Sequence, residues 1–366
     1  MARPTEIPVD IREDFLNELY PECMALLLKD HTTQENIYWA TDSYAGRGAG
    51  YGFFDPITVE AITGDNGMIV RPRALKDKAE QAQRVKDKAE VFTPSWVCNA
   101  QNNLVDEAWF GRSDVFNRVD PDNPHEWIDT EGEIIFPDTE GKTWKDYVAA
   151  RRLEITCGEA PYLVCRYDTV SGEPIKDVRH RIGLLDRKLI VVSQHTEVSL
   201  DWIMWAKIAL RATYGFEWQG DNLLLAREAI FVSFMEHYFA KFGKVPTKTH
   251  LKGAAYIISW NVWQMDGLKY GLPGYEPKEK TDEQIKIEAD LPKQLSIWGT
   301  EEETVEPEIL PQERLCRVKD MIGSKNIHRP NLRNQDFSDN DTRQQKFLDV
   351  INENSKKKTV KQREKK

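Results

Sequence analysis

The stretch LEITCGEAPYL, residues 153–163, decides the fold that this sequence predicts. Its first residues read as the end of an apolar strand, Gly158 marks a turn, and the following residues begin an apolar helix. In a parallel α/β sheet, ligands bind at the carboxyl ends of strands, where the backbone must approach them closely. The segment therefore predicts a ligand site, although a strand, turn and helix of this kind is also an ordinary structural joint.

Two later segments repeat this pattern of an apolar strand that ends in an acidic residue. TYGFEWQGDNLLLAREAI, residues 213–230, places Glu217 between a short strand and a helix. YIISWNVWQMDGL, residues 256–268, ends a strand at Asp266 and Gly267. A carboxylate at such a strand end can accept both hydroxyl hydrogens of a ribose. An acid at a helix start is also favoured by the helix dipole alone, so a purely structural role for Glu217 stays open.

The three segments, in this order, resemble motifs I, II and III of adenine-specific (amino) DNA methyltransferases. Against the motif I pattern DPACGSGAFL, Glu154 falls on the acidic position, Gly158 on the first glycine and Tyr162 on the aromatic position, while Ala160 replaces the second glycine. Upstream, EVFTPSWVCNAQNNLVD, residues 90–106, resembles motif X, with a predicted N-cap at Thr93 and the helix starting at the next residue. The resemblance covers residues 91–276.

The resemblance implies an α/β fold of the Rossmann-like S-adenosylmethionine-dependent methyltransferase class, with S-adenosyl-L-methionine as cofactor. It implies that Glu217 holds the ribose, that Trp218 lies along the adenine, and that Asp266 contacts the adenine amino group. The residues that it assigns to cofactor binding are Thr93, Glu154, Thr156, Cys157, Gly158, Tyr162, Glu217, Trp218, Asp266 and Gly267.

Catalysis is not accounted for by these motifs. Amino methyltransferases carry an Asp/Asn/Ser-Pro-Pro-Tyr/Phe tetrapeptide, whose side-chain and carbonyl oxygens accept the hydrogens of the target amine while its ring stacks on the flipped base. No such tetrapeptide occurs in the chain, and the nearest match, residues 272–275 (LPGY), lacks the oxygen and the second proline. Catalytic residues are therefore unknown.

Two functions remain open on this evidence. One is a DNA adenine methyltransferase-like protein of a restriction-modification or phage-defence system, because residues 91–276 look like proteins described as restriction endonuclease subunit M. Its partners would be double-stranded DNA and a restriction or specificity subunit. The other is a noncatalytic cofactor- or DNA-binding subunit that needs a partner. A nuclease is disfavoured, because no carboxylate pair with a nearby lysine falls on adjacent predicted strands.

The sequence predicts three regions. Residues 1–90 form an N-terminal extension with helices, residues 91–276 form the methyltransferase-like domain, and residues 277–366 form a charged, mostly flexible tail. Within that tail, Gln294 to Trp298 (QLSIW) resembles the peptides with which bacterial sliding-clamp partners enter a hydrophobic groove. A sliding clamp is therefore a further predicted partner.

Composition limits the protein's class. The net charge of −10 argues against coating nucleic acid through bulk electrostatics, although residues 71–90 and 356–366 are locally basic. The five cysteines lack paired spacing, so neither a disulfide framework nor a zinc site is expected. No apolar run is long enough to span a bilayer, and the N-terminus lacks the apolar stretch of a secretory signal. We therefore expect a cytoplasmic protein without a metal.

Overall fold

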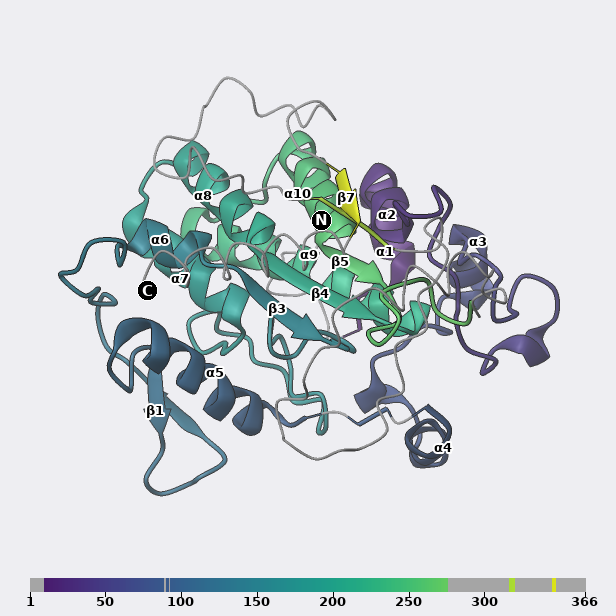
Figure 1. Cartoon of the computed structure of the whole chain (residues 1–366), viewed down its shortest axis with the longest axis horizontal. Helices are drawn as coiled ribbons and strands as arrows, with labels where there is room; N and C mark the ends of the chain where they lie inside the picture. The colour runs from purple at the N-terminus through teal and green to yellow at the C-terminus, as the bar shows by residue number, and fades with distance from the viewer. Residues whose placement is uncertain (1–9, 89, 92, 276–315, 320–343, 347–366) are drawn as a thin grey trace, which may run out of the picture.

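The computed structural model describes residues 10–88, 90–91, 93–275, 316–319 and 344–346. Within these residues the protein is a mixed α/β structure, which confirms the α/β class (Figure 1). The clamp-like segment 294–298 and most of the predicted tail lie outside the described residues. None of the described helices is long and apolar enough to cross a membrane.

A parallel sheet of three short strands lies at the centre. Strands β3 (Arg152–Ile155), β4 (Thr213–Glu217) and β5 (Val262–Gln264) are hydrogen-bonded in the order β3-β4-β5. Two antiparallel pairs complete the described strands: β1 (Asn117–Val119) with β2 (Trp127–Asp129), and β6 (Arg317–Lys319) with β7 (Gln344–Lys346). The sheet brings the strand ends of the first two predicted motifs next to each other.

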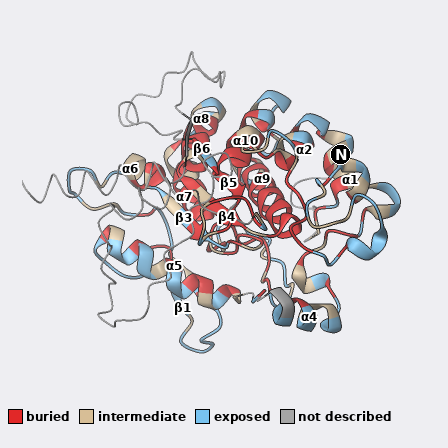
Figure 2. Ribbon diagram, turned by 45° about the vertical axis from the view of Figure 1, so that its right-hand side comes forward, coloured by how far each residue is buried: buried red, intermediate tan, exposed pale blue. Residues whose placement is uncertain are grey.

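Long helices connect the parallel strands. Helices α7 (Leu184–His195) and α8 (Ser199–Arg211) lie between β3 and β4, and α9 (Gly220–Phe242) and α10 (Lys248–Asn261) lie between β4 and β5. Every residue of α9 from 220 to 238 is buried, and Figure 2 shows this helix as a continuous red core element. The helix therefore lies at the centre of the core, although several of its buried residues, such as Arg227 and Glu236, are charged.

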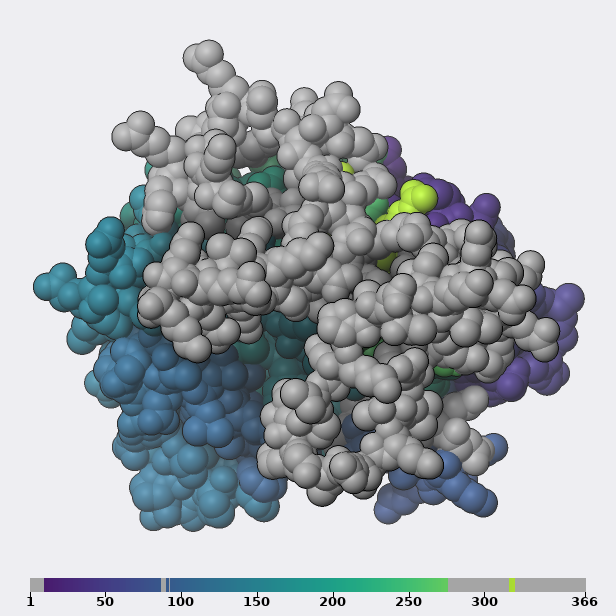
Figure 3. Space-filling model, viewed as in Figure 1, coloured from purple at the N-terminus to yellow at the C-terminus, as the bar shows by residue number. Residues whose placement is uncertain are grey.

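The remaining helices precede the sheet in sequence. They are α1 (Glu13–Leu19), α2 (Pro21–Leu28), α3 (Val59–Ile62), α4 (Lys78–Lys88), α5 (Ser95–Phe110) and α6 (Trp144–Ala149), with three 3₁₀ turns at Ala45–Arg47, Gly64–Asn66 and Arg73–Leu75. In the face seen in Figure 3, the purple N-terminal segment lies at the right, and the blue region that includes α5 lies at the lower left.

The N-terminal segment shares its core with the sheet region. A single cluster of buried apolar side chains runs from Ile11 to Val262 and includes residues of α2 and α9. The buried Arg227 of α9 donates from Nη1 to the carbonyl oxygens of Leu27 (2.6 Å) and Lys29 (2.9 Å). Residues on both sides of the predicted boundary at 90/91 therefore pack together as one unit.

Two local predictions need correction. The apolar run at 256–261 is helical, because α10 begins at the Thr247 cap and continues to Asn261, leaving only residues 262–264 as strand. Thr93 does not cap helix α5: Pro94 holds the N-cap position, and the backbone N–H and hydroxyl of Ser95 donate to Asp168 Oδ2 (2.6 and 2.5 Å). The carboxylate of a distant loop thus does the capping that was expected of a local hydroxyl.

Candidate functional site

A cavity of about 720 Å³ lies where β3 and β4 end. One part of its wall follows β3, another follows β4 into the start of α9, and the rest comes from the N-terminal side of the chain. The lining residues are Phe53, Lys86, Glu90, Val91, Thr93, Glu154, Thr156, Cys157, Gly158, Pro161, Tyr162, Glu217, Trp218, Gln219 and Asn222.

Eight of the ten residues predicted to bind the cofactor line this one cavity: Thr93, Glu154, Thr156, Cys157, Gly158, Tyr162, Glu217 and Trp218. The sequence separates the first of them from the last by more than a hundred positions. The parallel pairing of β3 with β4 brings the two strand ends together, because the carboxyl ends of parallel strands meet at one edge.

Asp266 and Gly267 do not line the cavity. Asp266 instead shapes a turn, since its Oδ1 accepts from the backbone N–H groups of Leu268 (2.8 Å) and Lys269 (3.2 Å). A Cβ at Gly267 would lie 2.7 Å from the ring of Phe216, so that glycine allows the turn to pack on β4. The structure thus brings two of the three predicted carboxylates together and gives the third a different setting.

The loop after β3 has an unusual backbone. Thr156, Gly158 and Ala160 all have left-handed backbones, with φ of 49°, 53° and 63°. Only glycine adopts this conformation without steric cost. The loop is fixed to β4, because Cys157 N–H donates to the Phe216 carbonyl (2.9 Å) and Gly158 N–H donates to Glu217 Oε2 (2.9 Å).

Glu217 is buried and held by the backbone. Besides Gly158, the N–H of Gln219 donates to its Oε1 at 3.2 Å. Burial raises the pKa of Glu217 to about 7, and the backbone donors act against that rise. Each carboxylate oxygen keeps a lone pair, so Glu217 can still accept hydrogen bonds from a ligand.

Glu154 is buried beside it. Its Oε1 accepts from the backbone N–H of Tyr162 at 3.4 Å, while its buried Oε2 has no hydrogen-bond partner. Burial, and the nearby charge of Glu217, raise the pKa of Glu154 well above its usual range. The neighbouring Cys157 is fully buried, and burial raises the pKa of its thiol strongly, so it does not behave as a nucleophile.

Four further polar residues of the cavity were not predicted from the sequence: Lys86, Glu90, Gln219 and Asn222. Glu90 and Asn222 are both buried, and Asn222 Nδ2 donates to Glu90 Oε2 at 3.3 Å. Arg84 on α4 donates from Nε to the same oxygen at 2.6 Å and from Nη2 to Asp221 Oδ2 at 2.8 Å. Glu90 follows a helix rich in charged residues, a setting that in sequence resembles any solvated helix end.

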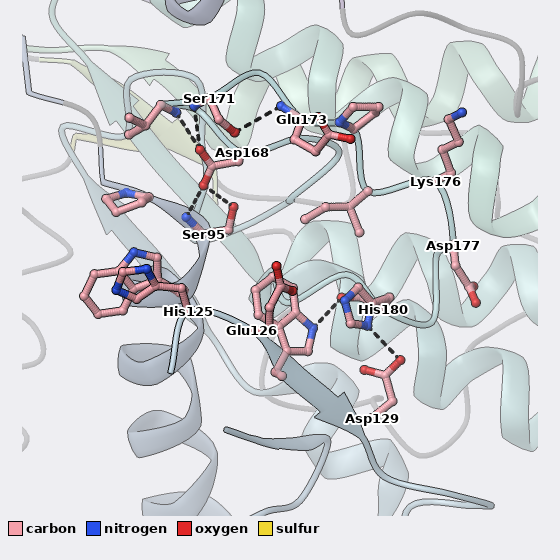
Figure 4. Close-up of a pocket in the computed structure, with 16 residues that line it drawn as sticks. Ser95, His125, Glu126, Asp129, Asp168, Ser171, Glu173, Lys176, Asp177 and His180 are labelled. Atoms are coloured by element: carbon pink, nitrogen blue, oxygen red, sulfur yellow. Dashed lines mark hydrogen bonds and ion pairs between the residues drawn. The ribbon is translucent and has the colours of Figure 1, made fainter. Parts of the chain in front are cut away.

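A second cavity, of about 560 Å³, lies near the N-terminus of α5 (Figure 4). Two stacked pairs contribute to its wall, Trp96 on His125 and Trp127 on His180. Several of its polar groups are paired within the protein: His180 Nδ1 lies 3.0 Å from Asp129, and Asp168 accepts from Ser95 and from the loop that includes Ser171. None of its lining residues carries a buried polar side-chain atom without a partner. The cavity at β3 and β4 is therefore the stronger candidate for a ligand site.

Across the part of the chain that the structure describes, no group of three or more His, Cys, Asp or Glu residues is arranged to hold a metal ion. All five cysteines are free and buried. No protein-family model, curated protein or solved structure matches the chain.

Proposed function

We propose that the cavity at the ends of β3 and β4 binds S-adenosyl-L-methionine and that the chain is a DNA adenine methyltransferase-like protein with a Rossmann-like fold. One observation carries this proposal: Glu154, the Gly158 turn and Glu217, which the sequence places in two separate motifs, line one cavity at adjacent parallel strand ends. Helical crossovers between parallel strands, as in β3 to β4 to β5, are what such a fold requires.

The residues of the cavity fit such a ligand. The buried acceptor Glu154 Oε2 has no protein partner, and a nucleoside with an amino acid portion brings hydroxyl and amino hydrogens for oxygens of this kind. Glu217 would hold the ribose hydroxyls, Trp218 would lie along the adenine, and Thr93 would border the methionine end. When bound, the cofactor supplies an electrophilic methyl group, and the chain's part is to hold and orient it.

A second candidate is a cofactor-binding subunit that does not transfer methyl groups by itself. The absence of the Asp/Asn/Ser-Pro-Pro-Tyr/Phe tetrapeptide from the sequence favours it. In that case a partner such as a restriction or specificity subunit would complete the enzyme on double-stranded DNA. The cytoplasmic setting and clamp binding through Gln294 to Trp298 stay predictions.

Calorimetric binding of S-adenosylmethionine to the full chain tests the shared part of both candidates. Glu217→Ala should abolish binding, whereas Glu126→Ala, in the second cavity, should leave it unchanged. Unchanged affinity in Glu217→Ala would end the site assignment. Transfer of labelled methyl to unmethylated DNA, with and without the proteins encoded next door, then separates the two candidates, because only the first predicts labelling by the chain alone.

A further inference from the structure

The cavity contains buried acceptor atoms that the protein leaves without a partner. Glu90 Oε1 and Asn222 Oδ1 are two of them, and the two residues are 7% and 1% exposed. Both residues line the cavity with Glu154, whose Oε2 is also unpaired. Buried polar atoms in folded proteins are almost always hydrogen-bonded, so these atoms indicate a ligand that supplies hydrogens.

Glu90 is held in a fixed position. Its Oε2 accepts from Arg84 Nε (2.6 Å) and Asn222 Nδ2 (3.3 Å), which leaves Oε1 for a ligand. Arg84 is itself anchored, because its Nη2 donates to Asp221 Oδ2 (2.8 Å) and Gln219 Oε1 (3.1 Å) at the start of α9. A carboxylate fixed in this way loses little entropy when it binds a ligand.

The free oxygen of Glu90 favours a donor group in the ligand. Arg84 and Asn222 contact only Oε2, Oε1 has no partner, and the one lysine that lines the cavity, Lys86, is exposed. An asparagine side-chain oxygen only accepts hydrogen bonds, and so does an ionised carboxylate, so the ligand group between Glu90 and Asn222 must donate. A primary ammonium offers three N–H groups, and its hydrogen bonds to a carboxylate are of the strong, charge-assisted kind.

We propose that Glu90, positioned by Arg84, binds a primary ammonium group of the ligand, together with the side-chain oxygen of Asn222. The inference rests on the proposed function, in which this group is the amino group of the methionine portion of S-adenosylmethionine. It gives the N-terminal side of the chain a direct part in ligand recognition, since α4 presents Arg84 and Glu90 follows that helix.

A ligand-by-variant cycle tests the proposal by calorimetry or competition binding on the full chain. The two probes are S-adenosylmethionine and its analogue in which a hydroxyl replaces the amino group. We expect Glu90→Gln to weaken S-adenosylmethionine about ten- to a hundredfold and to leave the analogue unchanged within about twofold. The control Glu80→Gln, which changes an acid of α4 that is about one-third exposed, should affect neither probe.

The possible outcomes distinguish the role of Glu90 from the proposed function. Equal weakening of both probes, or no weakening of S-adenosylmethionine, would overturn the role of Glu90 while leaving the cofactor site intact. Failure of the unaltered protein to bind either probe would overturn the proposed function, and the role of Glu90 with it. If Glu90→Gln does not fold, Asn222→Ala removes the second acceptor instead. It should likewise weaken S-adenosylmethionine binding and leave binding of the analogue unchanged.

Discussion

At the scale of single residues, Thr156 combines an exposed, β-branched side chain with a left-handed backbone (φ 49°). That conformation costs a non-glycine residue about 1–2 kcal/mol, whereas the extra freedom of glycine in the unfolded chain costs about 0.5–1 kcal/mol. We therefore expect Thr156→Gly to raise the free energy of unfolding by up to about 1 kcal/mol, as measured by urea denaturation.

Thr156→Ala is the matched control, because it removes the same hydroxyl and keeps the Cβ. It should stay close to the unaltered protein. Equal stability of the glycine and alanine variants would show that the turn does not hold strain at this residue.

Glu217 makes ligand binding sensitive to pH under the proposed function. Its pKa of about 7 means that the carboxyl group is mostly protonated at pH 6 and mostly ionised at pH 8. The ionised form accepts ribose hydrogens better, so S-adenosylmethionine affinity should fall about tenfold from pH 8 to pH 6. Calorimetry across this range measures it. Glu217→Gln should bind weakly at every pH, and a similar pH dependence in that variant would assign the titration to another group, such as Glu154.

A site residue could be predicted from the sequence only where the secondary structure around it indicated a ligand site. Glu154 and Glu217 were predictable because each lies within the last two residues of a strand of the parallel sheet, where the carboxyl ends face a ligand. Asp266 also follows a strand, but its carboxylate is used by the N–H groups of its own turn. Glu90 gave no signal, because Arg84, six residues earlier, does not lie at the three- or four-residue spacing that marks a helical ion pair.

At the scale of elements, Arg84 attaches α4 to the start of α9. It pairs with Glu90 (2.6 Å) and Asp221 (2.8 Å), and all three side chains are nearly inaccessible to solvent. Removing one partner of a buried ion pair leaves an uncompensated charge, which typically costs 3–5 kcal/mol. We expect Arg84→Ala to lower the free energy of unfolding by about 3 kcal/mol in thermal or urea denaturation.

Arg71→Ala provides the comparison on the same segment. Arg71 pairs with Glu80 at 3.2 Å, but both side chains are about one-third exposed, so the change should cost less than about 1 kcal/mol. Similar losses in the two variants would mean that burial does not distinguish the two pairs.

A helix or strand could be predicted where its amino-acid composition and its capping residues indicated the same element. The charged run at 74–89 is rich in strong helix formers, and α4 occupies Lys78–Lys88 within it. The run YIISW at 256–260 is apolar throughout, and such a run does not distinguish a buried helix from a buried strand. The Thr247 cap, which accepts from the His250 N–H at 3.4 Å, was the signal for the helix. Pro21 was a similar signal for the break between α1 and α2.

At the scale of the whole molecule, α1 and α9 each carry a buried acid, and the charge of the first affects the second. Glu13 and Glu228 are 1% and 0% exposed, and none of their carboxyl oxygens has a hydrogen-bond partner. Burial is the main cause that raises the pKa of Glu13 to about 8; burial and the charge of Glu13 raise the pKa of Glu228. The folded protein therefore holds protons that the unfolded chain releases at a lower pH.

The sign of the stability change follows from linkage. Between the unfolded pKa near 4.5 and the folded pKa near 8, the native state binds more protons, so stability falls as pH rises through about 8. Glu13 alone should lower the free energy of unfolding by about 1.4 kcal/mol from pH 7 to pH 9, and Glu228 adds to this fall. Glu13→Gln should lose part of this dependence in urea titrations at both pH values. An equally steep fall in the variant would place the titrating group elsewhere, with Glu228 as the first alternative.

The pairing of the central sheet has a consequence for the order of folding. Arg152 pairs with Thr213, and Gly215 pairs with Val262, so neither pair of strands is a hairpin. In each case two helices lie between the paired strands in sequence, and these helices must fold and pack before the strands can pair. Contacts between residues so far apart in sequence form slowly, because a long loop must close before any contact compensates for the lost entropy. In pulse-labelled hydrogen exchange during refolding, amides of α7 to α10 should become protected before those of β3, and the cavity would be among the last features of the molecule to appear.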